Sequence, residues 1–234
     1  MRTSGDRMGS NGFDHLAVID IETTGLDADA DLILEVGVVI VDPQLHEVAH
    51  RSVLITTRDA VAWARRTRKQ ARAGGKATAE LNPAQKMHLD NGLVEDLLFP
   101  RPLKPNAVGL DLQSQMVASD YSVAAQQLCM FLDRHLIIDP VPMVGSSVRS
   151  LDAPFLEAHM PALLSRFSHR TIDASALIEL SRFIDPAGCD AVTSAIGASS
   201  HRTIGDCRRS LDTIRSFAAH YRIGDVGKPG PTER

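Results

Sequence analysis

The segment that decides the fold is VIDIETTGL, residues 18–26. It begins as an apolar run typical of a buried strand, and two acids one residue apart, Asp20 and Glu22, then interrupt it. Side chains two positions apart on a strand point to the same face, so both carboxylates project together while Ile19 and Ile21 face the other side. Two adjacent carboxylates repel each other, and burying them costs several kcal/mol unless a positive charge compensates.

Two interpretations of this pair stay open from the segment alone. In the first, the carboxylates hold a divalent cation, because hard oxygen ligands suit Mg²⁺ or Mn²⁺. In the second, one acid faces solvent at the strand end and the other caps a turn. The D-x-E pattern is short, so further acids must be found elsewhere before a metal site is supported.

Working outward from this strand, the 234 residues predict one α/β domain with a mixed sheet flanked by helices. The first three strands are joined by short loops, which indicates an antiparallel meander. Apolar residues then recur with helical spacing in the second half of the chain. The expected strands are 16–21, 32–42, 48–56, 141–147 and 168–174, and the expected helices are 122–136, 153–160, 174–183 and 206–221.

The composition indicates an ordinary globular protein, with 44% hydrophobic and 23% charged residues. The net charge of −4 excludes a general polyanion binder, so contact with nucleic acid must be local or assisted by metal ions. No apolar run is long enough to span a membrane, and residues 1–12 lack the apolar core of a signal peptide. Three cysteines without a C-x-x-C pair favour reduced thiols and a cytoplasmic location.

The domain is expected over residues 13–222, between a flexible leader, 1–12, and a flexible tail, 223–234. Two segments fit a compact core poorly and are expected as surface insertions, at about 64–80 and about 100–120. The first carries six cations with no acid before its end, and the second carries three prolines. The cations have two interpretations, a solvated flexible loop or a track for a phosphate backbone.

Further candidate residues lie in the second half of the chain. Asp152 follows a predicted buried strand at a helix start, and alone it predicts an N-cap. Asp206 alone is a cap or a solvated helix acid, and His201 precedes it by five residues. Five helical residues would rotate the two side chains about 140° apart. They converge only if His201 lies on a loop and Asp206 in the first helical turn, and Gly205 permits such a turn.

Together these residues resemble the DEDDh exonucleases of the ribonuclease H-like fold. The chain is similar in particular to the oligoribonuclease family in four ordered segments. These are DIETTGLD at 20–27, KMHLDNGLVEDL at 86–97, GSSVRSLDAPFLEAHMP at 145–161 and HRTIDASALIEL at 169–180. The chain departs from the family pattern by Thr23 for Met, Asn91 for Ser, His169 for Tyr and an extra residue near Arg149. Pro83 stands about where the family has an aromatic residue. Trp63 is the candidate to take the place of that aromatic residue.

The resemblance implies a site with two divalent cations, Mg²⁺ or Mn²⁺, about 3.5–4 Å apart. Asp20 would bridge the ions, and Glu22, Asp152 and Asp206 would complete the ligands. His201 would act as the general base that deprotonates the attacking water. The implied reaction releases nucleoside 5′-monophosphates from the 3′ end of RNA.

The resemblance also implies how the substrate is held. Leu26 would wedge between two bases, with Gly25 allowing close backbone approach, although core packing is an alternative role for Leu26. His88 would contact the sugar or the 3′ end, and His169 would stack on a base. A cap on the 5′ phosphate would restrict the substrate to very short RNA, ideally dinucleotides. The residues of this cap would be Ser147, Arg170 and Ser175. The family is also dimeric, so the resemblance implies a homodimer.

Two other functions stay open. One is a broader DEDDh exonuclease that acts on longer single strands of DNA or RNA, which the basic segment 64–80 favours. The other is a non-catalytic protein that binds nucleic acid or a partner through the same fold. The complete set of five catalytic-type residues argues against this second alternative.

Overall fold

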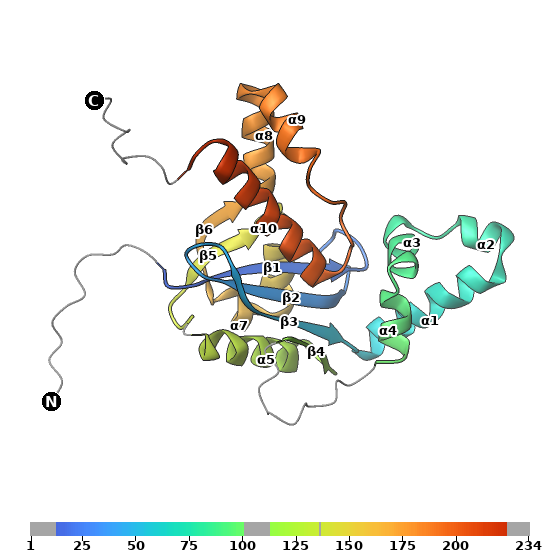
Figure 1. Ribbon diagram of the computed structural model, residues 1–234. Coiled ribbons are helices and arrows are strands. Elements are labelled where there is room, and N and C mark those ends of the chain that lie inside the picture. The colour runs from blue at the N-terminus through green and yellow to red at the C-terminus, as the bar shows by residue number, and fades with distance from the viewer. Residues whose placement is uncertain (1–12, 101–112, 136, 224–234) are drawn as a thin grey trace, which may run out of the picture.

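The computed structural model describes residues 13–100, 113–135 and 137–223. The expected leader, most of the expected tail and residues 101–112 of the second expected insertion lie outside the described residues. One six-stranded sheet, in the order β4-β3-β2-β1-β5-β6, runs through the described part of the chain (Figure 1). The mixed sheet flanked by helices that the sequence predicted is therefore confirmed.

The first three strands form the predicted antiparallel meander. Strand β2 is buried at all nine positions, which explains its almost continuous apolar sequence. Strands β5 and β6 lie parallel to β1, and β4 lies parallel to β3. Residues 113–118, expected within a surface insertion, instead form β4, whose polar sequence QSQMVA hid the strand pattern. The strands are β1 (Leu16–Thr23), β2 (Ile33–Val41), β3 (Glu47–Ile55), β4 (Gln113–Ala118), β5 (Val141–Gly145) and β6 (Phe167–Asp173).

Helices cover both faces of the sheet (Figure 1). Alternate residues of β1 point to opposite faces, so Ile19 packs with the α5, α6 and α7 side and Val18 packs with α10. Helices α8 and α9 lie beside α10. These helices are α5 (Tyr121–Arg134), α6 (Asp152–His159), α7 (Pro161–Leu164), α8 (Ala174–Ile184), α9 (Pro186–Thr193) and α10 (Thr203–His220).

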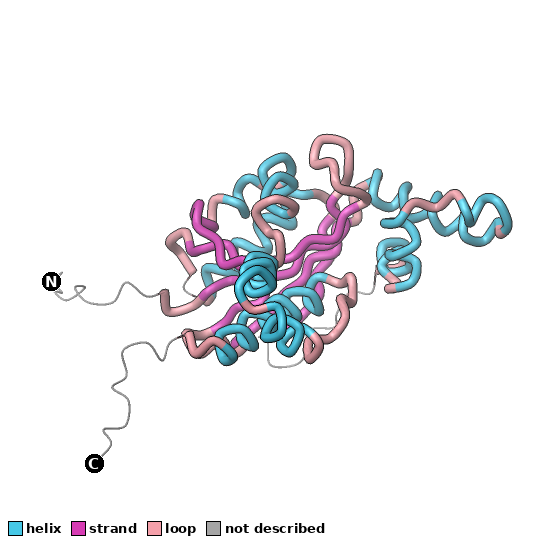
Figure 2. Tube along the Cα trace, turned by 90° about the horizontal axis from the view of Figure 1, so that it is seen from above, coloured by secondary structure: helices cyan, strands magenta, loops and turns pink. Residues whose placement is uncertain are grey.

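Four more helices follow β3 and form an arm that extends beyond the end of the sheet (Figure 2). We call residues 58–98 the helical arm. One side of its first helix is buried, where Trp63 and Ala64 pack on apolar residues of β2, β3 and the last arm helix. The arm helices are α1 (Arg58–Ala73), α2 (Gly75–Ala79), α3 (Pro83–Asp90) and α4 (Leu93–Leu98).

The basic segment 64–80 therefore lies in helices, and the interpretation as a flexible loop is wrong. Helix α1 begins at a cap, where the Thr57 hydroxyl accepts a hydrogen bond from the Ala60 N–H. Its buried residues recur at i, i+3, i+4 and i+7, a helical period that the surrounding cations obscured in the sequence.

None of the described helices is long and apolar enough to cross a membrane.

Candidate functional site

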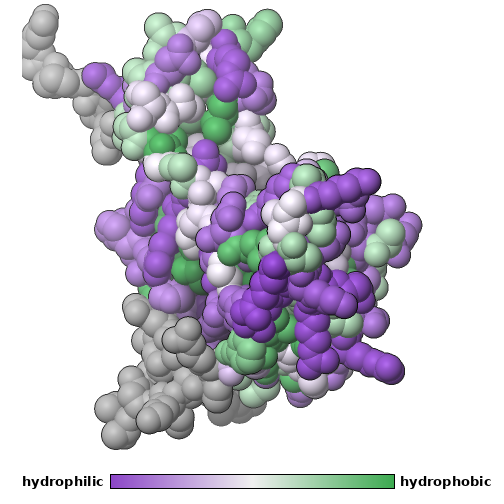
Figure 3. Space-filling view, turned by 90° about the vertical axis from the view of Figure 1, so that its right-hand side faces the viewer, coloured by the Kyte–Doolittle hydropathy of each residue, from purple (hydrophilic) through white to green (hydrophobic). Residues whose placement is uncertain are grey.

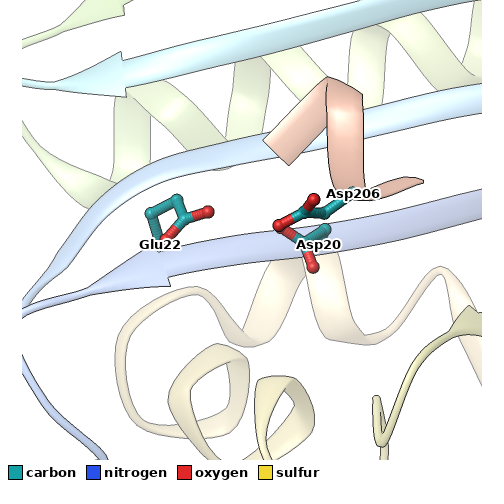
Figure 4. A group of neighbouring side chains, drawn as sticks. All are labelled: Asp20, Glu22 and Asp206. Atoms are coloured by element: carbon teal, nitrogen blue, oxygen red, sulfur yellow. The ribbon is translucent and has the colours of Figure 1, made fainter. Parts of the chain in front are cut away.

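Three carboxylates meet at the end of β1 that faces the arm. Asp20 and Glu22 project from the same face of the strand, and Asp206 reaches them from the first turn of α10 (Figure 4). One ligand oxygen from each of the three lies within 4.8 Å of the others. The structure thus brings together the D-x-E pair and the later Asp206, as the sequence predicted.

Asp152, at the start of α6, lines the pocket that Asp20 and Glu22 also line. Its carboxylate accepts a hydrogen bond from the Ile21 N–H at 3.0 Å. Strand β5 pairs with β1 only at Ala17 and Val18, so the Ile21 N–H lies beyond that pairing and needs another acceptor. The N-cap role inferred for Asp152 alone is therefore wrong, because its side chain makes no cap and serves the strand instead.

The electrostatics of these carboxylates are unfavourable without a cation. Burial, followed by the charges of Asp152 and Glu22, raises the pKa of Asp20 well above its usual value. Burial and then the charge of Asp206 raise the pKa of Glu22 to about 8, and burial raises the pKa of Asp152 to about 7. Across the described residues, no lysine or arginine forms an ion pair with any of the four acids. An oxygen-rich, anionic site of this kind fits a hard divalent cation.

Asp20, Glu22 and Asp152 line a pocket of about 510 Å³ between β1, α6 and the arm. The wall on the arm side is formed by α3 and contains Pro83 and Met87. Leu26 lies on the rim with 82% of its side chain exposed, so core packing is not its role. Gly25 also lines the pocket, and a Cβ there would lie 2.3 Å from the Asp31 carboxylate, so the glycine is needed for close packing of its own loop.

His201 lies on the loop before α10, as its spacing to Asp206 required. Ser199 joins the two residues, since its hydroxyl donates to the Asp206 carboxylate at 2.7 Å. The same oxygen lies 3.1 Å from the His201 backbone nitrogen and 3.1 Å from His201 Nδ1. Because the Ser199 hydroxyl donates its hydrogen bond to Asp206, its oxygen accepts hydrogen bonds from both His201 nitrogens. In this arrangement Nδ1 carries the imidazole proton, and the Nε2 lone pair can accept a proton.

Gly205 has a different role from the one inferred from sequence. It lies within helix α10 without a positive φ, so it does not make the turn. A Cβ at this position would lie 2.1 Å from the Ser200 hydroxyl. Glycine therefore leaves room for the loop, whose Ser200 N–H donates to Asp206 at 2.9 Å. The residue with positive φ at the junction is His201 itself, at 51°.

A second buried acid, Glu35 of β2, lies opposite Glu22 in the ladder between the two strands. Its side chain is 2% exposed, and Arg202 donates to both of its oxygens at 3.1 Å. Arg202 also donates to Asp96 of α4 at 2.9 Å, and Gln115 donates to Glu35 at 2.7 Å. No motif marked Glu35, Arg202 or Gln115, although an acid inside an otherwise apolar strand was a visible signal.

His88 lies behind the pocket wall rather than in the pocket. Its ring is fully buried, and Nε2 donates to the Thr23 carbonyl at 2.9 Å and lies 3.9 Å from a Glu22 oxygen. Trp63 is also buried and meets the His88 ring edge-on, with ring centroids 6.0 Å apart. The expected sugar contact is thus not available to His88 from this position, and Trp63 does not replace the missing aromatic at Pro83.

Asn91 connects the arm to the His201 loop. Its side-chain amide donates to the His201 carbonyl, and its oxygen accepts from the Leu93 N–H at 2.9 Å. The same amide nitrogen lies 3.4 Å from Nδ1 of His88. Asn91 was visible in the sequence only as a departure from the family pattern, and the structure gives it a contact that helps to fix the loop.

The two serines of the expected phosphate cap lie together. Ser147 donates to the Ser175 hydroxyl at 3.0 Å, and the backbone N–H groups of both donate to Asp173, at 3.0 and 2.8 Å. Arg170 and His169 are exposed on β6, where the pairing with β5 shifts register. Within the part of the chain that the structure describes, no hydrogen bond or ion pair joins the Arg170 side chain to these serines.

Comparison with known proteins gives a consistent picture, although no protein-family model matches the chain. The oligoribonuclease of Xanthomonas campestris pathovar campestris is 32% identical over 219 residues, which cover 92% of each chain. The oligoribonuclease of Aromatoleum aromaticum is 30% identical over 210 residues, 89% of this chain and 92% of its own length. That of Thiobacillus denitrificans is 29% identical over 213 residues, 88% of this chain and 94% of its own.

The fold also resembles solved structures. A zinc-bound Escherichia coli ExoI–ssDNA complex aligns with 90% of this chain at a TM-score of 0.54 and 12% identity. The alignment spans 41% of the ExoI chain. At this identity the likeness concerns the fold alone, and it confirms the ribonuclease H-like sheet expected from the sequence.

Proposed function

The chain belongs to the oligoribonuclease family of 3′–5′ exoribonucleases, and we propose that it degrades very short RNA, with dinucleotides preferred, to nucleoside 5′-monophosphates. The observation that carries this proposal is the cluster of Asp20, Glu22 and Asp206, with Asp152 on the adjoining pocket, and none of the four pairs with a lysine or arginine among the described residues. A non-catalytic binding protein would have no reason to keep such a costly arrangement.

Membership of this family implies the use of divalent metal, and the donor set fits it because every candidate ligand is a carboxylate oxygen. In our proposal two ions, Mg²⁺ or Mn²⁺, are held by Asp20, Glu22, Asp152 and Asp206, with Asp20 shared. When bound, such ions lower the pKa of water and stabilise the charge that develops on the scissile phosphate.

His201 is the proposed general base. Its Nδ1 proton faces the Ser199 oxygen, which leaves the Nε2 lone pair available to accept a proton from the attacking water. Ser199, Asn91 and Arg202 act as positioning residues, because they hold the loop through hydrogen bonds to its backbone or to neighbouring acids.

The proposed substrate contacts follow from the family resemblance, and of these residues Leu26 lines the pocket. Leu26, exposed on the rim, separates the two bases of a dinucleotide. Ser147 and Ser175 receive the 5′ phosphate, and Arg170 adds a charged fork when the substrate is bound. His169 would stack on a base, and we further propose a homodimer. Three free cysteines support a cytoplasmic location.

The experiment that tests this proposal compares RNAs of graded length. End-labelled, 5′-phosphorylated RNAs of two to seven nucleotides should be hydrolysed with Mg²⁺ and with Mn²⁺. We expect kcat/KM to be highest for the dinucleotide, because a longer strand loses the contact of a terminal phosphate with the cap, worth about 1.5–3 kcal/mol. Equal efficiency on dimers and heptamers, unchanged by Arg170→Ala, would contradict the preference for dinucleotides.

A second candidate, a 3′–5′ exonuclease for longer single strands, is favoured by one observation. Helix α1 presents a stripe of cations on the arm that also forms one wall of the pocket. The length series separates the two candidates, because this second function predicts an efficiency that holds or rises with length.

A further inference from the structure

Helix α1 has two faces of opposite character. Its buried residues are Ala60, Trp63, Ala64 and Thr67, and these pack inside the arm. Four cations recur with the same i, i+3, i+4, i+7 spacing on the other side of the helix, so they form a continuous stripe about 10 Å long. These cations are Arg65, Arg68, Lys69 and Arg72.

The stripe borders a hollow of about 350 Å³, which we call the basic groove. The groove is lined by Arg65, Arg68, Lys69, Arg72, Leu98 and Phe99. Figure 3 faces this end of the molecule and shows strongly hydrophilic side chains projecting beside hydrophobic ones. The Phe99 ring is 58% exposed, and the Arg68 guanidinium lies over it, 5.0 Å from its centroid.

The positive charge of the groove is largely uncompensated. Arg68 pairs with Glu95 at 2.7 Å, whereas no acid among the described residues forms an ion pair with Arg65, Lys69 or Arg72. The chain as a whole has a net charge of −4, so this concentration of cations is local. Such a patch attracts a polyanion, and the attraction depends on salt.

We propose that the basic groove binds single-stranded RNA outside the active-site pocket. Arginine forks match phosphate oxygens, and an exposed aromatic ring gives an unpaired base a surface for stacking, so the groove offers both contacts that a single strand uses. A duplex hides its bases and would not use Phe99 in this way. This inference goes beyond the proposed function, which concerns the RNA hydrolysed in the pocket, because the groove lies outside that pocket.

The groove is separate from the pocket but connected to it through the arm. The pocket wall is made by α3, and Gln85 of α3 donates to Thr67 of α1 at 3.0 Å. The two sites share no lining residue. A strand held in the groove would therefore be bound close to the pocket without occupying the place of the dinucleotide.

The test compares two double variants of the arm that remove the same charge. Arg65→Ala with Lys69→Ala removes two cations of the groove, and Arg66→Ala with Lys76→Ala removes two exposed cations outside it. Both are made in an Asp20→Asn background, and binding of a fluorescein-labelled 20-nucleotide single-stranded RNA is followed by anisotropy at several salt concentrations.

We expect the groove variant to bind the RNA about tenfold or more weakly, and its salt dependence to flatten by about 1.4, or 0.7 for each lost contact. The control variant should bind like the parent. Equal losses in both variants, or no loss in either, would overturn the proposal. With Asp20 intact, the groove variant should hydrolyse a dinucleotide normally, so failure of the groove is distinguishable from failure of the proposed function.

Discussion

Glu22 and Glu35 face each other across the ladder between β1 and β2, and they are buried to a similar degree, at 6% and 2% exposure. Glu35 receives both arms of the Arg202 fork and an amide proton of Gln115. Glu22 has no arginine or lysine partner in the described structure, and burial with the charge of Asp206 raises its pKa to about 8. Burial of an acid therefore does not by itself indicate a metal site, and the proposed site differs from Glu35 in having several acids together without a paired lysine or arginine in the described structure.

The same stretch of chain supplies the side chains that lie beside both acids. The start of α10 sends Asp206 to the Glu22 side and Arg202 to Glu35, with His201 directly before Arg202. Glu35 is thus paired by the protein and helps to fix the loop, whereas Glu22 is a ligand for an ion in our proposal. The predictions that follow separate these two roles.

The largest expected difference concerns hydrolysis. Glu22→Gln should lower dinucleotide hydrolysis about a thousandfold, because a neutral amide holds hard cations weakly and bound ions supply several kcal/mol of transition-state stabilisation. Glu35→Gln should retain metal affinity and lose far less activity. Initial rates at saturating Mg²⁺, with Mn²⁺ affinity measured in parallel, provide the test. Equal losses of metal affinity in both variants would show that Glu22 and Glu35 do not differ in their role in metal binding.

The next prediction concerns stability without metal at pH 8. Glu35→Gln should lower the free energy of unfolding by about 1–3 kcal/mol, because Arg202 loses its charged partner inside the protein. Glu22→Gln should raise it by at least about 1 kcal/mol, because an uncompensated buried charge is removed. Urea denaturation gives both values. Glu95→Gln, which breaks the exposed pair with Arg68, is the control and should change stability by less than about 1 kcal/mol.

The third prediction concerns pH. Glu22 and Asp152 have raised pKa values in the folded protein, so the unfolded chain loses these protons first as the pH rises. The unfolded state then binds fewer protons than the folded state, and this contribution to stability falls as pH rises. The metal-free protein should therefore lose stability between about pH 5 and pH 8, with Mg²⁺ restoring it most strongly at pH 8. A melting temperature of the metal-free protein that rises with pH across this range would contradict the pKa directions.

Glu22→Gln sharpens this pH experiment. The variant should show a flatter fall in stability over the same range, because one of the titrating groups is gone. Glu47, whose pKa is lowered to about 2 first by its hydrogen bonds with Arg208, acts in the opposite direction at lower pH. Its contribution is lost as the pH falls below about 4.5, so the comparison is made above that value.

The smallest expected effect belongs to the loop. Ser199→Ala should lower kcat on the order of tenfold, since general-base catalysis is worth about 10²–10⁴ in total and the substitution removes contacts to His201 and Asp206 but leaves both side chains in place. His201→Ala should remove the whole of that contribution, and the pH dependence of kcat should change in both variants. A Ser199→Ala enzyme with an unaltered pH profile would show that the Ser199 contact does not set the protonation of His201.

The sequence predicted those features that depend on local spacing. Alternation along β1 placed Asp20 and Glu22 on one face, and the five-residue spacing placed His201 on a loop before the turn that bears Asp206. Both follow from the geometry of a single element or its boundary. The meander and four helices of the second half, α5, α6, α8 and α10, were visible for the same reason, whereas α7 and α9 were not predicted.

Features that depend on distant partners were not predictable. Glu35 looked like an interruption of a strand until Arg202, 167 residues later in the chain, supplied its partner. His88 fitted a motif that implied a substrate contact, and only tertiary packing buried it beside Trp63. Strand β4 is polar in sequence and is defined by its pairing with β3, which no local pattern reveals.

The central claim is that the unpaired carboxylates, and not buried acids in general, form a site for two ions. Calorimetric titration of Mn²⁺ into the metal-free protein tests it most directly. We predict two ions per chain for the wild type and for Glu35→Gln, and weak or incomplete binding for Asp20→Asn. Mn²⁺ binding that is absent from the wild type, or that is unchanged in Asp20→Asn, would contradict the claim.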